Sequence, residues 1–256
     1  MTRPRTLQRH EWSGMTYEER RTYSAELAAW RATPEGQLEV AQQNARDVAA
    51  FEQERIKLAT QMFCDTDAEP GYQIGLPPRA VEIVLAGPQA TVAIEAVHGA
   101  EDICILLGAP GTGKTIAAVA RVHEYLFDVA NWSKHDPREY QTRPYFRRPR
   151  PIWRTAGQLA RIDHYKQAEI DRVGKVPLLV IDDLGAEFND SKGFFASLLD
   201  EVIDLRYSSR RSTIITSNLA APGFAARYGV RIVDRIREGG RFVGCGAESL
   251  RRRPGS

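Results

Sequence analysis

The sequence predicts an α/β protein in which helices cover both faces of a largely parallel β-sheet. From about residue 79 onward, short apolar segments alternate with helical segments, a pattern typical of strands buried on both faces of a parallel sheet. The loop GAPGTGKT, residues 108–115, lies between the first of these strands and a helix. A glycine-rich loop in that position indicates a phosphate-binding site. Together the two observations predict a nucleotide-binding domain.

Five segments are predicted to form the strands of this sheet. The first is the apolar run ICILL, and the others are similarly short. They cover residues 103–107 and roughly 152–155, 177–182, 212–216 and 241–244. Two helical segments precede the first strand, and a helix is expected from Thr115 to Phe127, directly after the glycine-rich loop. The alternation of strand and helix favours parallel pairing.

Residues 1–64 are predicted to form polar helices. Thr16 and Glu19 have the spacing of a capping box, and Thr33 followed by Pro34 is typical of a helix N-terminus. The second helical stretch carries a narrow apolar stripe, made of Val48, Phe51, Leu58 and Met62. So thin a stripe buries little core by itself. The segment is therefore either a small helical hairpin or a docking module for a partner protein.

Residues 65–78, DTDAEPGYQIGLPP, are predicted to form a linker. The segment is rich in acidic residues, proline and glycine, a composition that disfavours regular secondary structure. The chain is thus expected to consist of a helical segment at 1–64, this linker, and a nucleotide-binding domain at 79–256.

The composition is typical of a soluble globular protein, with 43% hydrophobic and 27% charged residues. No segment approaches the roughly 18–20 consecutive apolar residues that span a bilayer, so no membrane partner is expected. The odd number of cysteines, three, suits a reducing cytoplasm better than a disulfide framework, so a cytoplasmic protein is expected. Cys64, Cys104 and Cys245 lie far apart and include no CxxC pair, which argues against a zinc site. A net charge of only +2 excludes an overwhelmingly basic nucleic-acid-binding protein but allows a local basic patch.

The loop GAPGTGKT matches the phosphate-loop pattern G-x-x-x-x-G-K-[ST] in full. Its glycines allow backbone N–H groups to surround phosphate oxygens, and the N-terminus of the following helix adds partial positive charge. Lys114 is expected to reach the β- and γ-phosphates of ATP, and the Thr115 hydroxyl to help hold Mg²⁺. The predicted nucleotide-binding residues of the loop are Gly108, Ala109, Pro110, Gly111, Thr112, Gly113, Lys114 and Thr115.

Two adjacent carboxylates lie at the end of the predicted strand at 177–182. Asp182 is its last residue, and Asp183 begins the turn that follows. In VPLLVIDDLGAE, Asp182 and Asp183 come at the carboxyl end of an apolar run, which places them at the sheet edge beside the phosphate loop. Asp182 is the predicted Mg²⁺ partner, usually through water, and Asp183 is the candidate that polarises the attacking water. Glu187 is a weaker candidate for the second role.

A third polar group follows the segment STIITSNL, residues 212–219. Asn218 comes at the tip of this β-rich segment. Beside the γ-phosphate its side chain would orient the attacking water. Elsewhere the same asparagine would only cap the next helix.

The order of these motifs resembles the DnaC/IstB-like branch of AAA+ ATPases. The matching segments lie between about residues 100 and 253: GAPGTGKT, LLVIDDLG, DEVIDLRYSSRRSTIITSNL, YGVRIVDRI and SLR. That branch contains bacterial and phage replicative-helicase loaders and the ATPase helpers of some transposases. The resemblance does not extend to residues 1–70.

The resemblance implies ATP and Mg²⁺ as cofactors and gives each motif a role. Residues 108–115 would be the Walker A motif, residues 182–183 the Walker B motif, and Asn218 sensor 1. Arg235 matches the arginine finger that enters a neighbouring subunit's ATP site, which implies self-association. Arg251 matches the sensor 2 arginine, which faces the nucleotide of its own subunit. The implied fold is an AAA+ P-loop domain with a five-stranded parallel sheet flanked by helices and little or no C-terminal lid, here preceded by the small helical segment.

Two features depart from the family pattern. Loaders often carry an N-terminal cysteine-rich metal site, and this sequence has none. The stretch after the Walker A helix is also longer than expected and contains QTRPYFRRPRPIWR, residues 141–154. Such a segment either tracks single-stranded DNA by phosphate contacts and base stacking or is a solvated proline-rich loop. Its arginines and aromatic residues are Arg143, Tyr145, Phe146, Arg147, Arg148, Arg150, Trp153 and Arg154.

The predicted function is ATP-dependent loading of a replicative helicase onto single-stranded DNA, with residues 1–64 gripping the helicase. One alternative is a helper that binds duplex DNA and recruits a transposase. Another alternative is a scaffold that binds ATP but scarcely hydrolyses it. The intact acids at 182–183 and Arg235 argue against this alternative. The core motifs barely separate a helicase from a transposase as the client.

Overall fold

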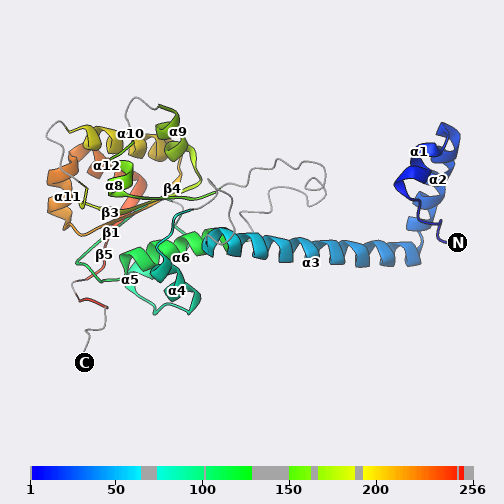
Figure 1. The fold of residues 1–256 in the computed structure, drawn as a ribbon, viewed down its shortest axis with the longest axis horizontal. Helices are drawn as coiled ribbons and strands as arrows, with labels where there is room; N and C mark the ends of the chain where they lie inside the picture. The colour runs from blue at the N-terminus through cyan, green and yellow to red at the C-terminus, as the bar shows by residue number, and fades with distance from the viewer. Residues whose placement is uncertain are drawn as a thin grey trace. The chain divides into compact units, whose positions relative to one another are not determined.

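The computed structural model describes residues 2–64, 74–100, 102–128, 150–162, 167–187, 193–246 and 248–250. The chain divides into two compact units, Met1–Lys57 and Leu58–Ser256. The first unit is helical, and the second contains the β-sheet (Figure 1).

Three helices follow one another from the N-terminus: α1 (Arg9–Gly14), α2 (Tyr17–Arg31) and α3 (Pro34–Cys64). The predicted capping box is confirmed, because Glu19 N donates to Thr16 Oγ1 and the Glu19 carboxylate accepts from Thr16 N. The predicted start of α3 is also confirmed. Pro34 is its first residue, and Gly36 N donates to Thr33 Oγ1 at 3.1 Å.

The N-terminal unit has a thin apolar core. Trp30 is the buried side chain of α2, and α3 passes so close that a Cβ on Gly36 would collide with the Trp30 carbonyl oxygen. Along α3, Leu38 and Val48 are exposed. The described side chains of this unit therefore bury little apolar surface, which is the expectation for a narrow stripe.

The last turn of α3 lies beyond the unit boundary and packs into the second unit. Ala59 and Phe63 are buried in its core, and so are Ile74 and Leu76. The latter two fall within the predicted linker at 65–78, whose residues up to 73 lie outside the described residues. The described end of that segment is therefore part of a hydrophobic core and is not a solvated linker.

The second unit is built on a five-stranded sheet whose neighbouring strands are all parallel. The strands are β1 (Ile103–Leu107), β2 (Ile152–Thr155), β3 (Leu178–Leu184), β4 (Ser212–Ser217) and β5 (Gly240–Gly244). Their order across the sheet is β2-β3-β4-β1-β5. The predicted fold class, a P-loop α/β domain with a five-stranded parallel sheet flanked by helices, is confirmed.

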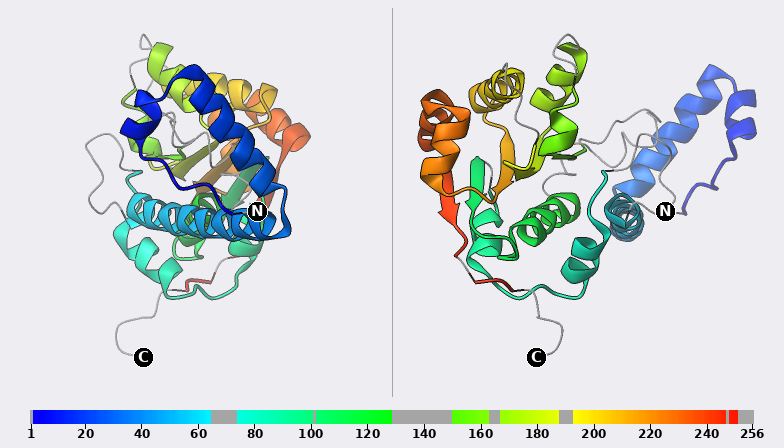
Figure 2. Two further views of the ribbon diagram at one scale, coloured as in Figure 1. Left: turned by 90° about the vertical axis from the view of Figure 1, so that its right-hand side faces the viewer. Right: turned by 60° about the vertical axis from the view of Figure 1, so that its left-hand side comes forward.

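Helices cover both faces of this sheet, as Figure 1 and Figure 2 show. In β1, Cys104 and Leu106 join one apolar cluster while Ile103 and Ile105 join the other, because successive side chains of a strand alternate between faces. The first cluster includes residues of α4 (Pro78–Leu85), α5 (Val92–Val97) and α6 (Lys114–Phe127). The second includes residues of α8 (Ala156–Leu159), α9 (Gln167–Lys175), α10 (Phe194–Ser208), α11 (Ala221–Tyr228) and α12 (Val230–Gly239).

The described residues after β5 form no further helix. Arg251 and the residues that follow it lie outside the described part of the chain. Of the helices that the structure describes, none combines the length and apolar character needed to cross a membrane.

Candidate nucleotide-binding site

The phosphate loop, residues 108–115, lies at the carboxyl edge of the sheet. It follows β1, and its last two residues begin α6. Because β1 pairs with β4 and β4 pairs with β3, the three strands end side by side. The acids that end β3 and the polar residues that end β4 therefore meet the loop at one edge.

Glycines shape the phosphate loop. Gly111 and Gly113 have φ values of 90° and 86°, in the left-handed region that favours glycine. In this conformation Gly113 forms the N-cap of α6. A Cβ on Gly108 would lie 2.9 Å from the Gly246 carbonyl oxygen, so a side chain at that position has no room. The glycine spacing of the motif thus follows from the shape of the loop.

Lys114 is folded into the loop. Its side chain is buried, and Nζ donates to the carbonyl oxygens of Gly108 at 2.7 Å and Ala109 at 2.8 Å. Thr112 Oγ1 donates to the same Ala109 oxygen at 3.0 Å. This arrangement holds a positive charge inside a loop that precedes a helix N-terminus, where an anion is attracted.

Asp182 and Thr115, the predicted Mg²⁺ pair, are in direct contact. Asp182 Oδ1 accepts hydrogen bonds from Thr115 Oγ1 at 3.1 Å and from Thr216 Oγ1 at 2.6 Å. Burial raises the pKa of Asp182 above its usual value, although the two hydroxyl groups partly oppose the shift. A carboxylate and a hydroxyl oxygen side by side are ligands that suit a hard cation. The donor set therefore fits Mg²⁺.

Asp183 is held in a strained conformation beside Asn218. Its φ of 63° lies in the left-handed region, which is uncommon for a residue other than glycine. Asp183 N donates to Thr216 Oγ1 at 2.9 Å, and Asn218 Nδ2 donates to Asp183 Oδ1 at 2.9 Å. The Asp183 side chain is exposed and lines a pocket beside the phosphate loop. Strain maintained by neighbouring contacts in this way is typical of functional sites.

Thr216 connects the two acids, and it is not among the functional residues predicted from the sequence. Its buried hydroxyl donates to Asp182 and accepts from the backbone of Asp183. The next residue, Ser217, donates from Oγ to the Leu184 carbonyl oxygen at 2.6 Å and so ties β4 to the end of β3. Because β4 also begins with two hydroxyl residues, Ser212 and Thr213, the composition of the strand does not single out this position.

Glu187, the weaker candidate for positioning water, is bound elsewhere. Its buried carboxylate accepts from Gly185 N at 2.7 Å, Tyr228 OH at 2.6 Å and Arg227 Nε at 2.9 Å. Burial, with the hydrogen bond to Glu187, raises the pKa of Tyr228. These contacts join the segment after β3 to α11. Glu187 is not among the residues that line the pocket beside the phosphate loop. Its contacts hold two segments of the fold together.

A pocket of about 610 Å³ adjoins the phosphate loop. Lys114, Thr115, Asp183 and Asn218 line it, so the structure brings together the predicted residues of all three motifs. Other lining residues belong to none of the three motifs and come mainly from α4 and the turn before it: Pro77, Arg79, Ala80, Ile83 and Leu250. The apolar members of this group suit a flat apolar ligand group such as a nucleotide base.

The C-terminal segment also reaches the phosphate loop. Leu250 N donates to the Gly111 carbonyl oxygen at 2.8 Å. A Cβ on Gly113 would lie 3.2 Å from Leu250 Cδ1. Arg251, predicted to face the nucleotide, directly follows this contact but lies outside the described residues.

Arg235, on α12, is not among the residues that line the pocket. Its Nη1 lies 2.8 Å from Asp200 Oδ1, and its Nη2 lies 2.6 Å from Asp204 Oδ1, with both acids on α10. The Arg235 side chain is only 16% exposed. Its contacts in the structure are within its own chain, and its action on a neighbouring subunit stays a prediction.

The arginine-rich segment at 141–154 lies outside the described residues up to position 149, which includes Arg143, Tyr145, Phe146, Arg147 and Arg148. Trp153 is described, and the stacking role considered for it is wrong. Its indole is 2% exposed and packs in the core as part of β2. Arg154 Nη1 donates to the Trp153 carbonyl oxygen. Trp153 thus follows the arginines because a buried strand begins there.

No protein-family model matches the chain. Among curated proteins, it is 33% identical over 70 residues to "Replicative helicase loader DnaC" from Buchnera aphidicola subsp. Baizongia pistaciae (strain Bp), covering 27% of this chain and 28% of the relative. It is 36% identical over 67 residues to the protein of the same name from Buchnera aphidicola subsp. Acyrthosiphon pisum (strain APS), covering 26% of each. The chain thus spans about a quarter of the length of these relatives.

Among solved structures, a crystal structure of the DnaC helicase loader is 22% identical, with a TM-score of 0.44. The match covers 64% of this chain and 89% of that one. The two curated matches confirm the resemblance to DnaC-type proteins that the motifs predict.

Proposed function

We propose that this protein binds ATP with Mg²⁺ and hydrolyses it to time the loading of a replicative helicase onto single-stranded DNA. The observation that carries the proposal is the meeting of three motifs in one pocket: the phosphate loop after β1, Asp183 after β3 and Asn218 after β4. Both curated relatives are named helicase loaders, which favours a helicase over a transposase as the client.

Phosphate binding would fall to the phosphate loop and Lys114. The N-terminus of α6 begins in this loop, and its partial positive charge attracts phosphate. Lys114 Nζ would exchange the carbonyl oxygens of Gly108 and Ala109 for phosphate oxygens, which form stronger, charge-assisted hydrogen bonds. ATP binding would therefore release Lys114 from the loop itself.

Thr115 and Asp182 would hold Mg²⁺. When bound, the ion neutralises charge on the β- and γ-phosphate oxygens. Thr216 donates to Asp182 from behind and would keep the carboxylate in one orientation, as partners of metal ligands commonly do. Burial disfavours the charged form of Asp182. A cation bound beside the carboxylate would stabilise that charged form, so ionisation of Asp182 and cation binding would favour each other.

Asp183 and Asn218 would act on the attacking water. The exposed Asp183 carboxylate lines the pocket and would accept a hydrogen bond from that water, which raises its nucleophilicity. The Asn218 amide donates to Asp183 Oδ1 and would set the direction of the carboxylate. Thr216 holds the backbone of Asp183 from the neighbouring strand.

The N-terminal unit would supply the contact with the helicase. It buries little apolar surface of its own, and Leu38 and Val48 are exposed along α3. A helix with an exposed apolar stripe is a common means of binding a groove on a partner protein. We assign the helicase contact to the exposed apolar residues of α3, Leu38 and Val48, and the timing to residues 79–256.

A reconstituted loading assay tests the proposal. The full-length protein is mixed with a hexameric replicative helicase from the same organism, single-stranded DNA and ATP, and the helicase retained on the DNA is measured. Loading should require ATP and should be lost in Lys114→Ala. Loading that is equally efficient without ATP would contradict the proposed timing. In a parallel mixture a transposase replaces the helicase, and ATP-dependent retention of the transposase alone would favour the alternative client.

The docking assignment has its own test. Leu38→Glu combined with Val48→Glu should abolish capture of the helicase and leave ATP binding intact, because both side chains lie in the N-terminal unit. Gln43→Glu adds negative charge at another exposed position of α3 and is the matched control. Normal capture by the double variant would exclude Leu38 and Val48 from the docking surface.

A further inference from the structure

A second cavity lies at the opposite edge of the sheet, where β1, β4 and β5 begin. Its volume is about 860 Å³, compared with 610 Å³ for the nucleotide pocket. The charged residues that line this arginine cavity are Arg206, Arg210, Arg211, Arg241, Asp102 and Glu238. Arginines outnumber acids two to one, and the proposed nucleotide chemistry uses none of these side chains.

Arg206 brings a fully buried positive charge to the arginine cavity. Its hydrogen-bond acceptors are the carbonyl oxygens of Val173, Gly174, Val176 and Ser212 and the hydroxyl of Thr213. All of these acceptors are neutral. Burial, together with the charge of Arg211, lowers the pKa of Arg206 to about 9, so the group is still protonated at neutral pH. The positive charge is therefore present and is not balanced by these contacts.

Two buried polar atoms of residues at this cavity have no hydrogen-bond partner among the described residues: Arg211 Nε and Asp102 Oδ1. A buried polar group without a partner costs free energy, and nearly all such groups in proteins have one. The charge of Asp102 is offset within the wall, because its Oδ2 lies 3.3 Å from Arg241 Nη1. Within the described part of the chain, the Arg211 guanidinium forms no comparable ion pair with a carboxylate.

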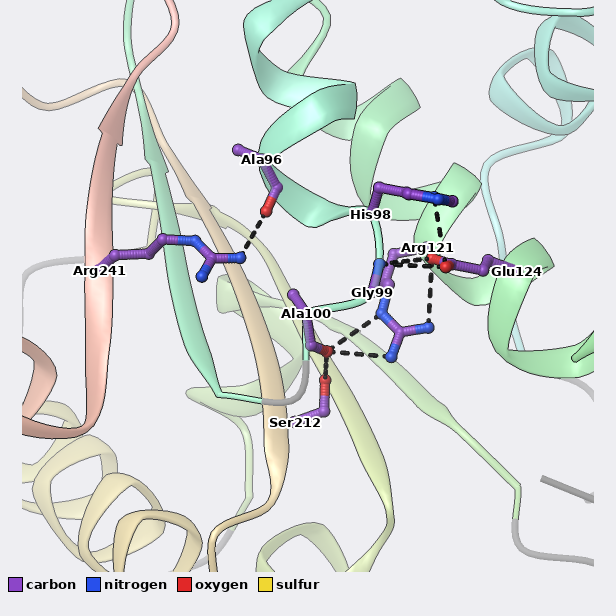
Figure 3. Close-up of polar contacts among 8 residues, drawn as sticks. All are labelled: Ala96, His98, Gly99, Ala100, Arg121, Glu124, Ser212 and Arg241. Carbon is purple, nitrogen blue, oxygen red and sulfur yellow. Dashed lines mark hydrogen bonds and ion pairs between the residues drawn. The ribbon is translucent and has the colours of Figure 1, made fainter. Parts of the chain in front are cut away.

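The wall of the arginine cavity is braced by several elements (Figure 3). Arg241 Nη2 donates to the Ala96 carbonyl oxygen at 2.8 Å. The Ala100 carbonyl oxygen accepts from Ser212 Oγ at 2.7 Å and from Arg121 Nη2 at 3.0 Å. Contacts from β5, β4 and α6 thus converge on the segment before β1. Groups held in place in this way lose little conformational entropy when a ligand binds.

Arg210 occupies a backbone position where glycine is usual. Its φ is 47°, and Arg211 N donates to the Arg206 carbonyl oxygen at 3.0 Å just after the end of α10. This hydrogen bond marks a helix C-terminus that favours glycine, because other residues are strained in the left-handed conformation. The Arg210 side chain is exposed and makes no ion pair within the described residues.

We propose that the arginine cavity binds a phosphate group, separately from the nucleotide pocket. A guanidinium donates in a planar fork that matches phosphate oxygens, and Arg210, Arg211 and Arg241 present three such groups around one cavity. A phosphate bound among these groups balances the positive charge that Arg206 and Arg211 bring to the cavity. The phosphate belongs either to a free anion or to the backbone of a single nucleic-acid strand, and the recognising chemistry is the same.

Arg210→Gly tests the proposal without damaging the fold. The change removes a cation and also relieves the left-handed strain, so Tm should stay level or rise. Combined with Arg211→Gln, it removes two cations from the arginine cavity. Arg237→Ala is the matched control, because Arg237 is an exposed arginine of α12 that does not line the cavity. A binding defect in a variant at least as stable as its parent is not a folding defect.

Binding is followed by NMR through the backbone amides of Gly239 and Gly240, which line the arginine cavity. The probes are inorganic pyrophosphate and a short oligothymidylate, each added to the full-length protein. Saturable shifts of these amides are expected with at least one probe. The affinity should be at least about tenfold weaker in the double variant, because two charge-assisted contacts are lost, and unchanged in Arg237→Ala.

The two probes identify the source of the phosphate. Saturable shifts with pyrophosphate alone support a free anion, and saturable shifts with the oligothymidylate support a nucleic-acid strand. The proposal is overturned if neither probe produces saturable shifts, or if the double variant binds with the affinity of its parent. Because the amides report on the arginine cavity itself, the result does not depend on ATP hydrolysis at the other edge.

Discussion

Arg235 Nη1 lies 2.8 Å from Asp200 Oδ1 of the same chain. Asp204 takes the other guanidinium nitrogen at 2.6 Å, and the second oxygen of Asp200 contacts Arg231 at 3.2 Å. The residue that the family resemblance assigns to a neighbouring ATP site is therefore neutralised by its own subunit. To act on a neighbour it must exchange these two carboxylates for phosphate charge. The acids of α10 would then decide how readily Arg235 becomes available.

Lys114→Ala should weaken ATP binding while the domain stays folded. The variant lacks the charge that meets the phosphates, and a hydrogen bond to a charged group contributes about 1.5–3 kcal/mol, which corresponds to roughly tenfold to a hundredfold in affinity. Calorimetric titration with ATP and Mg²⁺ measures the loss, and circular dichroism checks the fold. Binding at the parent's affinity would mean that the phosphate loop is not the nucleotide site.

Asp183→Asn should bind ATP almost normally and turn it over about 10²–10⁴-fold more slowly, the range for loss of a positioned base. Asparagine keeps the shape of the side chain, and its oxygen can still accept from Asn218. Steady-state phosphate release measures the effect. Glu187→Gln is the comparison and should retain turnover per folded molecule, because that carboxylate is bound to Tyr228 and Arg227. The opposite pattern in the two variants would transfer the catalytic role to Glu187.

The phosphate loop and the two acids could be predicted because each is a short motif of consecutive residues. A glycine-rich loop between an apolar strand and a helix has one favourable geometry, and parallel strands bring their carboxyl ends to one edge. The strands themselves are visible as apolar runs because both faces of the sheet are buried. Asn218 could be placed for the same reason, since it follows directly on β4.

Other parts of the site depend on contacts between residues far apart in the chain. Thr216 matters because β4 pairs with β3, and a threonine in a β-rich segment looks the same with or without that register. The contribution of Ala80 and Ile83 depends on how α4 packs beside the phosphate loop. Trp153 belongs both to the arginine-rich stretch and to the predicted strand at 152–155, and the pairing of that strand with Val180 sets its environment. Local spacing carries no information about any of these partners.

The raised pKa of Asp182 leads to a prediction about pH. Because this pKa is higher in the folded chain than the unfolded value near 3.8, the group stabilises the fold below that value and the contribution is lost as the pH rises through the folded pKa. Above the folded pKa, ionised Asp182 is therefore a net cost to the nucleotide-free protein. At neutral pH, Asp182→Asn should therefore raise Tm, by about 2–4 °C for each kcal/mol by which the free energy of unfolding increases. The same variant should lose Mg²⁺-dependent ATP binding.

Thermal denaturation over a series of pH values checks this prediction. The difference in Tm between Asp182→Asn and the parent should be largest near neutral pH and should shrink as the pH falls toward 3.8. Thr115→Val is a useful comparison, since it removes one hydrogen bond to Asp182 without changing a charge. A Tm at neutral pH equal to or below that of the parent would contradict the burial cost assigned to Asp182.

The ion pair between Arg235 and Asp200 allows a structural role to be separated from a catalytic one. Asp200→Asn breaks the pair from the other side. If Arg235 only holds α12 against α10, Arg235→Ala and Asp200→Asn should lower Tm and ATPase activity together. If Arg235 acts on a neighbouring site, Arg235→Ala alone should lose turnover, by about 10³–10⁵-fold as in well-studied arginine fingers, while ATP binding stays near normal.

Mixing two inactive variants gives the sharper test of that role. Lys114→Ala cannot use its own site but still presents Arg235, whereas Arg235→Ala has a sound site and no arginine to offer. Combined, they should recover part of the DNA-stimulated ATPase activity, because some interfaces then pair a sound site with Arg235. Arg231→Ala is the control for charge on the same helix, since it also contacts Asp200 but matches no family role, and it should stay active alone. If no ratio restores activity although both proteins assemble, Arg235 serves its own subunit, and its pairing with Asp200 and Asp204 is its function.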